Sequence, residues 1–229
     1  MQTPSSRRLV IAIDGPSGVG KGTVARALAS ALGYRHIDTG AMYRAVGWAA
    51  RRRALPLDDE AAVAALAEQV PMSLEGGAVM VDGVDVTREI RTPEMDAAAA
   101  QVARMPRVRA ALVTRQRAMG EGGGVVMEGR DIGTVVFPDA DVKLYLDASA
   151  DERARRRAAD PAHGGSVQAL SEVASALAAR DRSDSTRTAS PLTMAADAVL
   201  IDTTGVRVDE VVERALGVVR EVQTGANRC

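Results

Sequence analysis

The segment LVIAIDGPSGVGKGTVARALASALG at residues 9–33 decides the fold of this chain of 229 residues. Its first five residues are apolar and include Val and Ile, which is typical of a buried parallel strand. A glycine-rich loop follows, and residues 21–32 then place apolar side chains at helical spacing before a glycine. This order of strand, loop and helix predicts an α/β fold with the loop at the carboxyl edge of the sheet.

The loop is suited to binding phosphate. Backbone amides of such a loop converge on phosphate oxygens, and the positive end of the following helix dipole favours an anion. Lys21 directly follows the glycines and can reach the terminal phosphates of a nucleotide. The residues expected to bind the nucleotide are Gly15, Pro16, Ser17, Gly18, Val19, Gly20, Lys21, Gly22 and Thr23.

One position departs from the usual form of this loop. The residue after the lysine is commonly Ser or Thr, whose hydroxyl binds magnesium. Here that residue is Gly22, and Thr23 comes one position later. The sequence therefore leaves open which hydroxyl meets the metal, and a glycine-rich turn without a ligand is the alternative interpretation.

The rest of the chain alternates short apolar segments with helical patterns, which predicts a parallel sheet covered by helices on both faces. Further strands are expected at residues 35–38, 125–128, 142–146 and 198–201. Further helices are expected at residues 41–53, 107–119, 150–159 and 208–222. Residues 78–86 alternate around Asp82-Gly83, which predicts a small antiparallel insertion, and residues 160–166 predict a loop.

Composition excludes several classes of protein. A net charge of −1 gives no argument for a nucleic-acid or anionic-membrane surface, and 2% aromatic residues disfavour base-stacking modules. Cys229 is the only cysteine, which rules out an intrachain disulfide and favours a reducing compartment. No apolar stretch is long enough for a membrane span. We expect a soluble cytoplasmic protein with neither nucleic acid nor membrane as a partner.

Polar clusters follow two of the expected strands. Thr39, Tyr43 and Arg44 come after the second strand, and Arg130 and Asp131 come after the third. Strand ends of one parallel sheet meet at one crevice, so these groups are expected to bind a second, anionic substrate opposite the loop. Each cluster alone is equally consistent with a helix cap or a surface ion pair.

Two arginine-rich segments fit the same crevice. Arg180, Asp184 and Arg187 have the spacing of one helix face, where forked donors suit phosphate and a carboxylate suits ribose hydroxyls. A solvated salt-bridge row is the alternative. Arg153, Arg156 and Arg157 precede the loop at residues 160–166, and they belong either to an exposed helix face or to a lid.

The residues that metal centres and guanine-binding motifs require are absent from the sequence. His36 and His163 cannot form a metal site with a lone terminal cysteine, so no resident metal centre is expected. His36 is expected to pack at a strand edge. Asn227 is the only asparagine, which excludes the guanine-reading motif of GTPases. The sequence assigns no role to Lys143, the one lysine besides Lys21.

The chain resembles the bacterial cytidylate kinases, a family of nucleoside-monophosphate kinases. The resemblance rests on IDGPSGVGKGT (13–23), DTGAMYR (38–44), EIRT (89–92), PRVR (106–109), EGRDIGTVVFPDA (128–140), KLYLDAS (143–149) and RDRSDSTRTASPL (180–192). Adenylate kinases share the loop but not the later motifs.

The resemblance implies a P-loop kinase fold, with a five-stranded parallel sheet flanked by helices and a small inserted antiparallel sheet. It implies one domain at residues 7–229, preceded by a disordered terminus at residues 1–6. Within the domain it implies a CMP-binding insertion at residues 69–93 and a short lid at residues 153–166. A monomer is expected.

The resemblance also implies phosphoryl transfer from ATP to CMP or dCMP with Mg²⁺, in pyrimidine metabolism. The implied catalytic residues are Lys21, Arg130, Arg153, Arg157 and Arg187. The implied substrate contacts are Arg109 and Asp131 to cytosine, Arg180 and Asp184 to ribose, and Thr39, Tyr43, Arg44, Arg130 and Arg187 to the monophosphate.

One substrate contact of the family is missing. A base-contacting serine of some members is here Ala100, which leaves recognition of the cytosine amine to Asp131. Two other functions stay open at this point. One is a kinase acting on UMP, AMP or a small metabolite, and the other is a regulator that binds ATP without consuming it.

Overall fold

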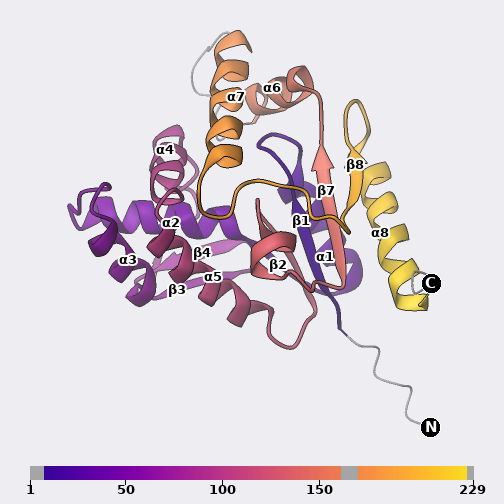
Figure 1. Cartoon of the computed structure of the whole chain (residues 1–229), viewed down its shortest axis with the longest axis horizontal. Coiled ribbons are helices and arrows are strands. Elements are labelled where there is room, and N and C mark those ends of the chain that lie inside the picture. Colours follow the sequence, from indigo (N-terminus) through magenta and orange to yellow (C-terminus); the bar gives the residue numbers. More distant parts are fainter. Residues whose placement is uncertain (1–7, 161–169, 226–229) are drawn as a thin grey trace.

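The central sheet is built around β1 (Val10–Asp14) in a computed structural model that describes residues 8–160 and 170–225 (Figure 1). Its order is β2 (Arg35–Asp38), β6 (Val125–Glu128), β1, β7 (Val142–Asp147) and β8 (Val199–Asp202). All four neighbouring pairs are parallel. The five predicted strands are confirmed, each with ends within one residue of the prediction.

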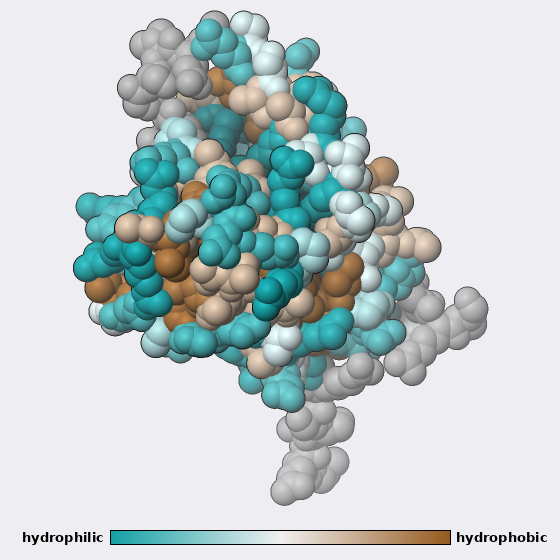
Figure 2. All heavy atoms as spheres, turned by 60° about the vertical axis from the view of Figure 1, so that its left-hand side comes forward, coloured by the Kyte–Doolittle hydropathy of each residue, from teal (hydrophilic) through white to brown (hydrophobic). Residues whose placement is uncertain are grey.

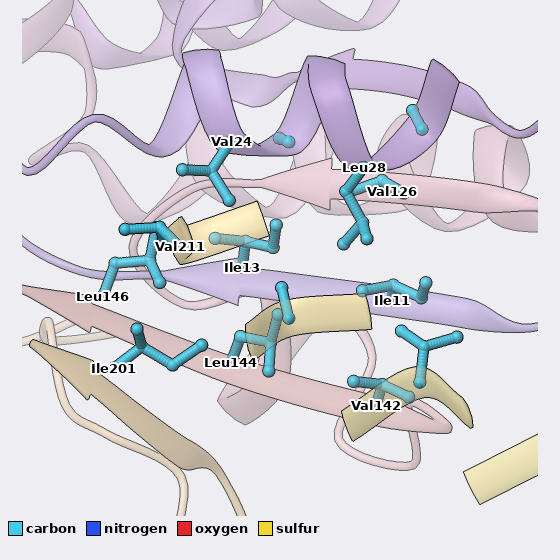
Figure 3. Packing of buried hydrophobic residues seen from close by; sticks show 14 of the residues in the cluster. Ile11, Ile13, Val24, Leu28, Val126, Val142, Leu144, Leu146, Ile201 and Val211 are labelled. Atoms are coloured by element: carbon cyan, nitrogen blue, oxygen red, sulfur yellow. The ribbon is translucent and has the colours of Figure 1, made fainter. Parts of the chain in front are cut away.

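One face of the sheet packs against α1 (Lys21–Leu32) and α8 (Val208–Thr224). Figure 3 shows Ile11 and Ile13 of β1 pointing into this layer beside Leu144 and Leu146 of β7. All four side chains are at most 1% exposed. The alternation of a strand explains the arrangement, because Ile11 and Ile13 share a face while Ala12 faces the other layer.

The opposite face packs against α5 (Pro106–Gly120) and a π-helical turn, η1 (Ile132–Val136). Beyond it, α2 (Thr39–Arg52) packs with α3 (Glu60–Gln69) and α4 (Pro93–Val102). Helices α2 and α5 were predicted from the sequence pattern, whereas α3, α4 and η1 were not. Both missed α-helices are rich in alanine, which gives little contrast between their faces.

The inserted sheet has three antiparallel strands: β3 (Met72–Glu75), β4 (Ala78–Val81) and β5 (Val84–Asp85). The predicted hairpin joins β4 to β5, and Asp82 and Gly83 have φ angles of 50° and 76°. Two consecutive positive φ angles are what a tight two-residue hairpin turn requires. The antiparallel insertion is therefore confirmed, with one more strand than the sequence indicated.

Two helices stand above the carboxyl ends of β1 and β7 in Figure 1: α6 (Ala150–Ala158) and α7 (Leu170–Thr186). The structure describes the expected lid only up to residue 160. The rest of the lid, with His163, lies outside the described residues, as does the expected disordered terminus. Helix α7 contains Arg180 and Asp184 but ends at Thr186, so the helical spacing expected for these three residues does not extend to Arg187.

The visible face in Figure 2 is largely hydrophilic, with apolar residues interspersed among polar ones. No helix in the described ranges is both long and apolar enough to cross a bilayer.

Candidate functional site

A cleft of about 760 Å³ lies at the carboxyl edge of the central sheet, between the lid helices and α2, α4 and α5. It joins the phosphate loop to the two strand-end clusters and to the arginines of α6 and α7. The convergence predicted from parallel strand ends is thus confirmed. Most of the residues proposed from sequence line this one space, and they come from α1, α2, α5, α6 and α7 and from the loops that follow β1, β6 and α7.

The phosphate loop fits closely between β7 and the lid. Gly15 has a φ of 146°, and a Cβ at this position would lie 2.1 Å from the backbone oxygen of Leu146. Gly18 has a φ of 84° and lies against Arg153, and Gly20 caps α1 with a φ of 91°. No side chain caps the amides that begin α1. These amides are therefore oriented to bind an anion.

Lys21 begins α1 and is 7% exposed. Its Nζ donates a hydrogen bond of 2.7 Å to the backbone oxygen of Pro16. Burial, followed by repulsion from Arg130, lowers the pKa of Lys21 from 10.5 to about 7. A phosphate placed beside this amine would favour its charged form, so anion binding is expected to shift Lys21 toward the protonated state.

The missing hydroxyl after Lys21 has a steric explanation. A Cβ on Gly22 would lie 3.1 Å from Oε1 of Glu128, which is buried at the end of β6. The same oxygen is 2.8 Å from Nε2 of His36 on β2. His36 does lie on an edge strand, but it orients Glu128 in addition to packing there.

The cluster after β2 surrounds the start of α2. Thr39 Oγ1 donates a 2.7 Å hydrogen bond to the backbone oxygen of Glu128, and Arg44 Nη2 donates a 2.9 Å hydrogen bond to Asp38. Burial raises the pKa of Tyr43 to about 12, so its hydroxyl keeps a proton to donate. These bonds tie β2 to β6 and place three donors along the wall of the cleft.

Arg109 of α5 and Asp131, just after β6, meet in the deepest charged contact of the site. Arg109 Nη2 lies 2.5 Å from Asp131 Oδ2, and both side chains are at most 7% exposed. The guanidinium of Arg109 also lies 5.4 Å from the ring centroid of Tyr43. Ala100 also lines the cleft. A donor and an acceptor thus stand side by side, as recognition of a base edge requires.

The residues that end α7 complete this wall. Asp184 accepts a 3.0 Å hydrogen bond from Nε of Arg130, and its other oxygen lies 3.5 Å from Arg187 Nη1. Burial, followed by Arg130, lowers the pKa of Arg180, and burial, followed by Arg109, lowers the pKa of Arg187. Both guanidiniums stay protonated. Since a second arginine contributes to each of these pKa shifts, positive charges are crowded in this part of the cleft.

Two of the arginines on α6 contact the phosphate loop. Arg153 Nη1 donates to the backbone oxygen of Ser17 at 3.2 Å and pairs with Asp181 of α7. Arg156 donates to the backbone oxygen of Val19 at 3.1 Å. A further arginine of α6, Arg157, pairs across the cleft with Asp96 of α4. This segment is therefore part of the site rather than a solvated helix face.

Unpartnered donors gather in the cleft. Among the buried side-chain polar atoms of the described residues, one guanidinium nitrogen on each of five arginines has no hydrogen-bond partner. Leaving such donors unpaired is costly, and a polyanionic ligand would satisfy them. The five arginines are Arg44, Arg109, Arg153, Arg180 and Arg187.

The sequence analysis missed several residues of the cleft. Asp96 lies 3.7–3.8 Å from Arg180 and Arg44, but it belongs to the unpredicted helix α4. Thr203 and Val206 line the cleft beside the phosphate loop from the connection between β8 and α8. Their only signal in the sequence is a position after a predicted strand. No group of acidic, histidine or cysteine residues within the described ranges is arranged to hold a metal by itself.

Comparisons with known proteins agree with this geometry. Residues 11–221 match the family model described as Cytidylate kinase. A cytidylate kinase from Desulfitobacterium hafniense (strain Y51) is 48% identical over 223 residues, which cover 96% of each chain. One from Pelotomaculum thermopropionicum is 50% identical over 208 residues, which cover 89% of this chain and 92% of the other.

Solved structures support the fold alone. A gluconokinase from Sinorhizobium meliloti 1021 matches with a TM-score of 0.50 and 17% identity, over 96% of this chain and 97% of the other. A shikimate kinase from Bacteroides thetaiotaomicron matches with a TM-score of 0.50 and 12% identity, over 93% and 98%. With the family model and the sequence relatives added to the geometry of the cleft, the chain belongs to the cytidylate kinase family.

Proposed function

We propose that this chain transfers the terminal phosphoryl group of ATP to CMP or dCMP, giving ADP and CDP or dCDP. The observation that carries the proposal is the single cleft, in which a phosphate loop faces a buried Arg109–Asp131 pair across a ring of arginines. A kinase for two nucleotides needs these two half-sites within reach of each other. A neutral acceptor such as a sugar would not require so many cations.

On the donor side, the triphosphate of ATP would lie on residues 15–23. The loop amides and the start of α1 would bind the β- and γ-phosphates, with Lys21 beside them. Arg153 and Arg157 approach from the lid, where they would neutralise charge on the phosphoryl group in transfer. Thr203 and Val206 lie beyond the loop, where the rest of ATP would extend.

On the acceptor side, the edge of the cytosine ring would lie against the Arg109–Asp131 pair. The exocyclic amine only donates, which suits the carboxylate, whereas the ring N3 and O2 only accept, which suits the guanidinium. Arg180 and Asp184 would hold the ribose. The monophosphate would be surrounded by donors from three segments of the chain: Thr39, Tyr43, Arg44, Arg130 and Arg187.

The chemistry then needs little covalent help. A phosphate oxygen of CMP attacks the γ-phosphorus of ATP, and the bond from that phosphorus to the β,γ-bridging oxygen breaks. The acceptor is already an anion at neutral pH, so no general base is required. Catalysis comes from alignment, from neutralising the charges of two anions, and from excluding water as a competing acceptor.

Mg²⁺ fits the oxygen donors beside the phosphate loop. The place of the usual P-loop hydroxyl is taken up by the carboxylate of Glu128, 3.1 Å from the Cβ position of Gly22. Carboxylates and phosphates are the ligands that Mg²⁺ prefers. We propose that Glu128, directly or through water, helps to hold the ion, which when bound would neutralise phosphate charge.

Measuring ADP release by a coupled assay with CMP, dCMP, UMP and AMP tests the proposed function. We expect rapid ADP release with CMP or dCMP, slower release with UMP, and only background with AMP or without acceptor. Preference for AMP or UMP would identify a different nucleotide kinase. ATP binding without turnover on any acceptor would support a nucleotide-binding regulator instead.

We further propose that the enzyme acts as a monomer in the cytoplasm. The cleft draws all its residues from one chain, so no second copy is needed to complete it. Analytical ultracentrifugation tests the oligomeric state. A single species near the chain mass of 23.9 kDa is expected, and a stable dimer at assay concentration would contradict it.

A further inference from the structure

Two buried charged residues take no part in the site described above. Asp14 at the end of β1 is 5% exposed, and Lys143 on β7 is 8% exposed. The other buried charged side chains of the described residues all line the cleft, whereas these two do not. Burying a charge is costly unless it is paired or hydrogen-bonded, so their partners reveal what they do.

Asp14 holds the start of the π-helical turn η1. Its Oδ1 accepts a 2.8 Å hydrogen bond from the backbone N–H of Ile132, and its Oδ2 accepts a 2.7 Å hydrogen bond from that of Gly133. These amides directly follow Arg130 and Asp131, which the proposed function assigns to the acceptor. One carboxylate therefore fixes the backbone on which the acceptor-binding side chains are mounted.

Lys143 holds the far end of the same turn. Its Nζ donates to the backbone oxygen of Pro138, just after η1, and lies 2.8 and 2.9 Å from the two carboxylate oxygens of Asp197. Its stem also packs beneath the turn, because a Cβ on Gly133 would lie 3.2 Å from Lys143 Cδ. The hydrogen bonds of Asp14 and Lys143 therefore hold the backbone of η1 at both of its ends.

The sheet explains why the two residues act together. Lys143 is paired with Ala12 across the β1–β7 ladder, and Asp14 lies two residues beyond Ala12 on the same face of β1. Both side chains thus reach the layer that contains η1. Asp14 is also the residue directly before the phosphate loop, so the anchor of the acceptor turn and the donor loop share one strand end.

The turn needs such an anchor because its backbone is irregular. Asp131 has φ −148° and ψ 25°, and Phe137 N–H bonds to the oxygen of Ile132 with the wide spacing of a π-helix. Single π-helical turns are rare and occur often at functional sites. Held only by its own hydrogen bonds, this segment would relax, and Asp131 would lose its position beside Arg109.

We propose that Asp14 and Lys143 are positioning residues that fix the turn η1 and thereby hold Arg130 and Asp131 in register with the phosphate loop. Neither residue lines the cleft. They contribute to the affinity for the acceptor and to the selectivity for cytosine. This inference rests on the proposed function. Through Asp14 the acceptor-binding turn and the ATP loop are built on one rigid strand.

The experiment compares Asp14→Asn and Lys143→Met with a matched control, Arg115→Met. Asn keeps the shape of Asp14 but offers one acceptor oxygen for two amides, and Met keeps the stem of Lys143 without its charge. Arg115 also holds backbone in place, since its Nη1 donates hydrogen bonds of 3.0 and 2.8 Å to the backbone oxygens of Ala67 and Val70 at the end of α3. It does not line the cleft, which makes it a suitable control.

We expect each test variant to raise the KM for CMP about tenfold, from the loss of one hydrogen bond to a charged group, with the KM for ATP changed less than about twofold. The ratio of kcat/KM for CMP over UMP should fall as well. Arg115→Met should lower the thermal unfolding temperature without moving either KM. A general loss of stability would not separate the two substrates in this way.

Equal rises in both KM values, or shifts no larger than those of Arg115→Met, would overturn the proposal. If Asp14→Asn does not fold, Asp197→Asn gives an independent test. Asp197 is 67% exposed, and losing its charge weakens the ion pair that holds Lys143 in place without removing a buried group. A rise in the KM for CMP of about threefold is then expected, and no rise would contradict the role of Lys143. If the wild type itself fails to phosphorylate CMP, the proposed function fails and the positioning role fails with it.

Discussion

Lys21 should take up a proton when ATP binds. In the ligand-free chain, burial and Arg130 lower the pKa of Lys21 to about 7. At about pH 8 a group with a pKa of about 7 is only about one-tenth protonated. Triphosphate beside the amine should return the pKa toward its ordinary value of 10.5. The expected uptake is therefore about 0.9 proton per ATP bound.

Isothermal titration calorimetry measures this number directly. ATP is titrated without acceptor at about pH 8, where its phosphates are already ionised, in two buffers of different ionisation enthalpy. The difference in apparent binding enthalpy gives the protons taken up. Lys21→Met is the perturbation, and it should abolish the uptake while the protein stays folded, because Met matches the apolar stem of lysine.

Turnover gives the second half of this test. Lys21→Met should lower kcat with CMP by about 10³-fold, since it removes a cation from the transferring phosphoryl group. Uptake near zero in the wild type, or equal uptake in both proteins, would refute the assignment of the titration to Lys21. Near-normal turnover in the folded variant would refute its catalytic role.

Further predictions concern recognition of the cytosine base, the role of the lid and the pH dependence of stability. Asp131→Ala should lower kcat/KM for CMP by about 10²–10³-fold with ATP affinity nearly unchanged, and equal damage to both would show a structural role. Ala100→Ser should raise the preference for CMP over UMP by about fivefold in kcat/KM, since it restores a hydroxyl for the amine, and an unchanged ratio would contradict this placement. Arg157→Ala should lower kcat by about 10²-fold and raise the share of ATP lost to water, whereas a change in KM for CMP alone would argue against a lid function. Burial raises the pKa of Asp14 from 3.8 to about 6, so between these values the folded chain binds more protons than the unfolded chain. The ionised carboxylate therefore destabilises the fold increasingly as pH rises through that window. In unfolding experiments, the free energy of unfolding of Asp14→Asn should rise by about 3 kcal/mol relative to wild type between about pH 4 and 7. A difference between the two proteins that does not change with pH would contradict this prediction.

The first strand, the loop and α1 could be predicted from sequence because each boundary carries a local signal. The apolar run of β1 ends at Asp14-Gly15, and α1 ends at Gly33, whose φ is 65°. Such signals depend on backbone conformation alone. Helix α4 had comparable signals in Thr92, whose side chain accepts from the N–H of Met95, and in Pro93. Its alanine-rich pattern hid them.

The candidate site was predictable as far as it follows strand ends. Arg130 and Asp131 could be placed because parallel strands share a carboxyl edge. Asp96, Asp14 and Lys143 could not, since their partners depend on the packing of α4 and on the register between β1 and β7. The arginines of α6 show the same limit, because their sequence pattern allowed two interpretations and only the contacts to the phosphate loop decide between them.

The most direct test of the two-nucleotide cleft is the stoichiometry of its products. Purified protein is incubated with ATP, Mg²⁺ and CMP, and the nucleotides are separated by anion-exchange chromatography. The proposed function predicts one CDP formed for each ADP, with almost no inorganic phosphate. ADP formed together with inorganic phosphate but without CDP would show that water accepts the phosphoryl group, and it would contradict the assignment of the acceptor site.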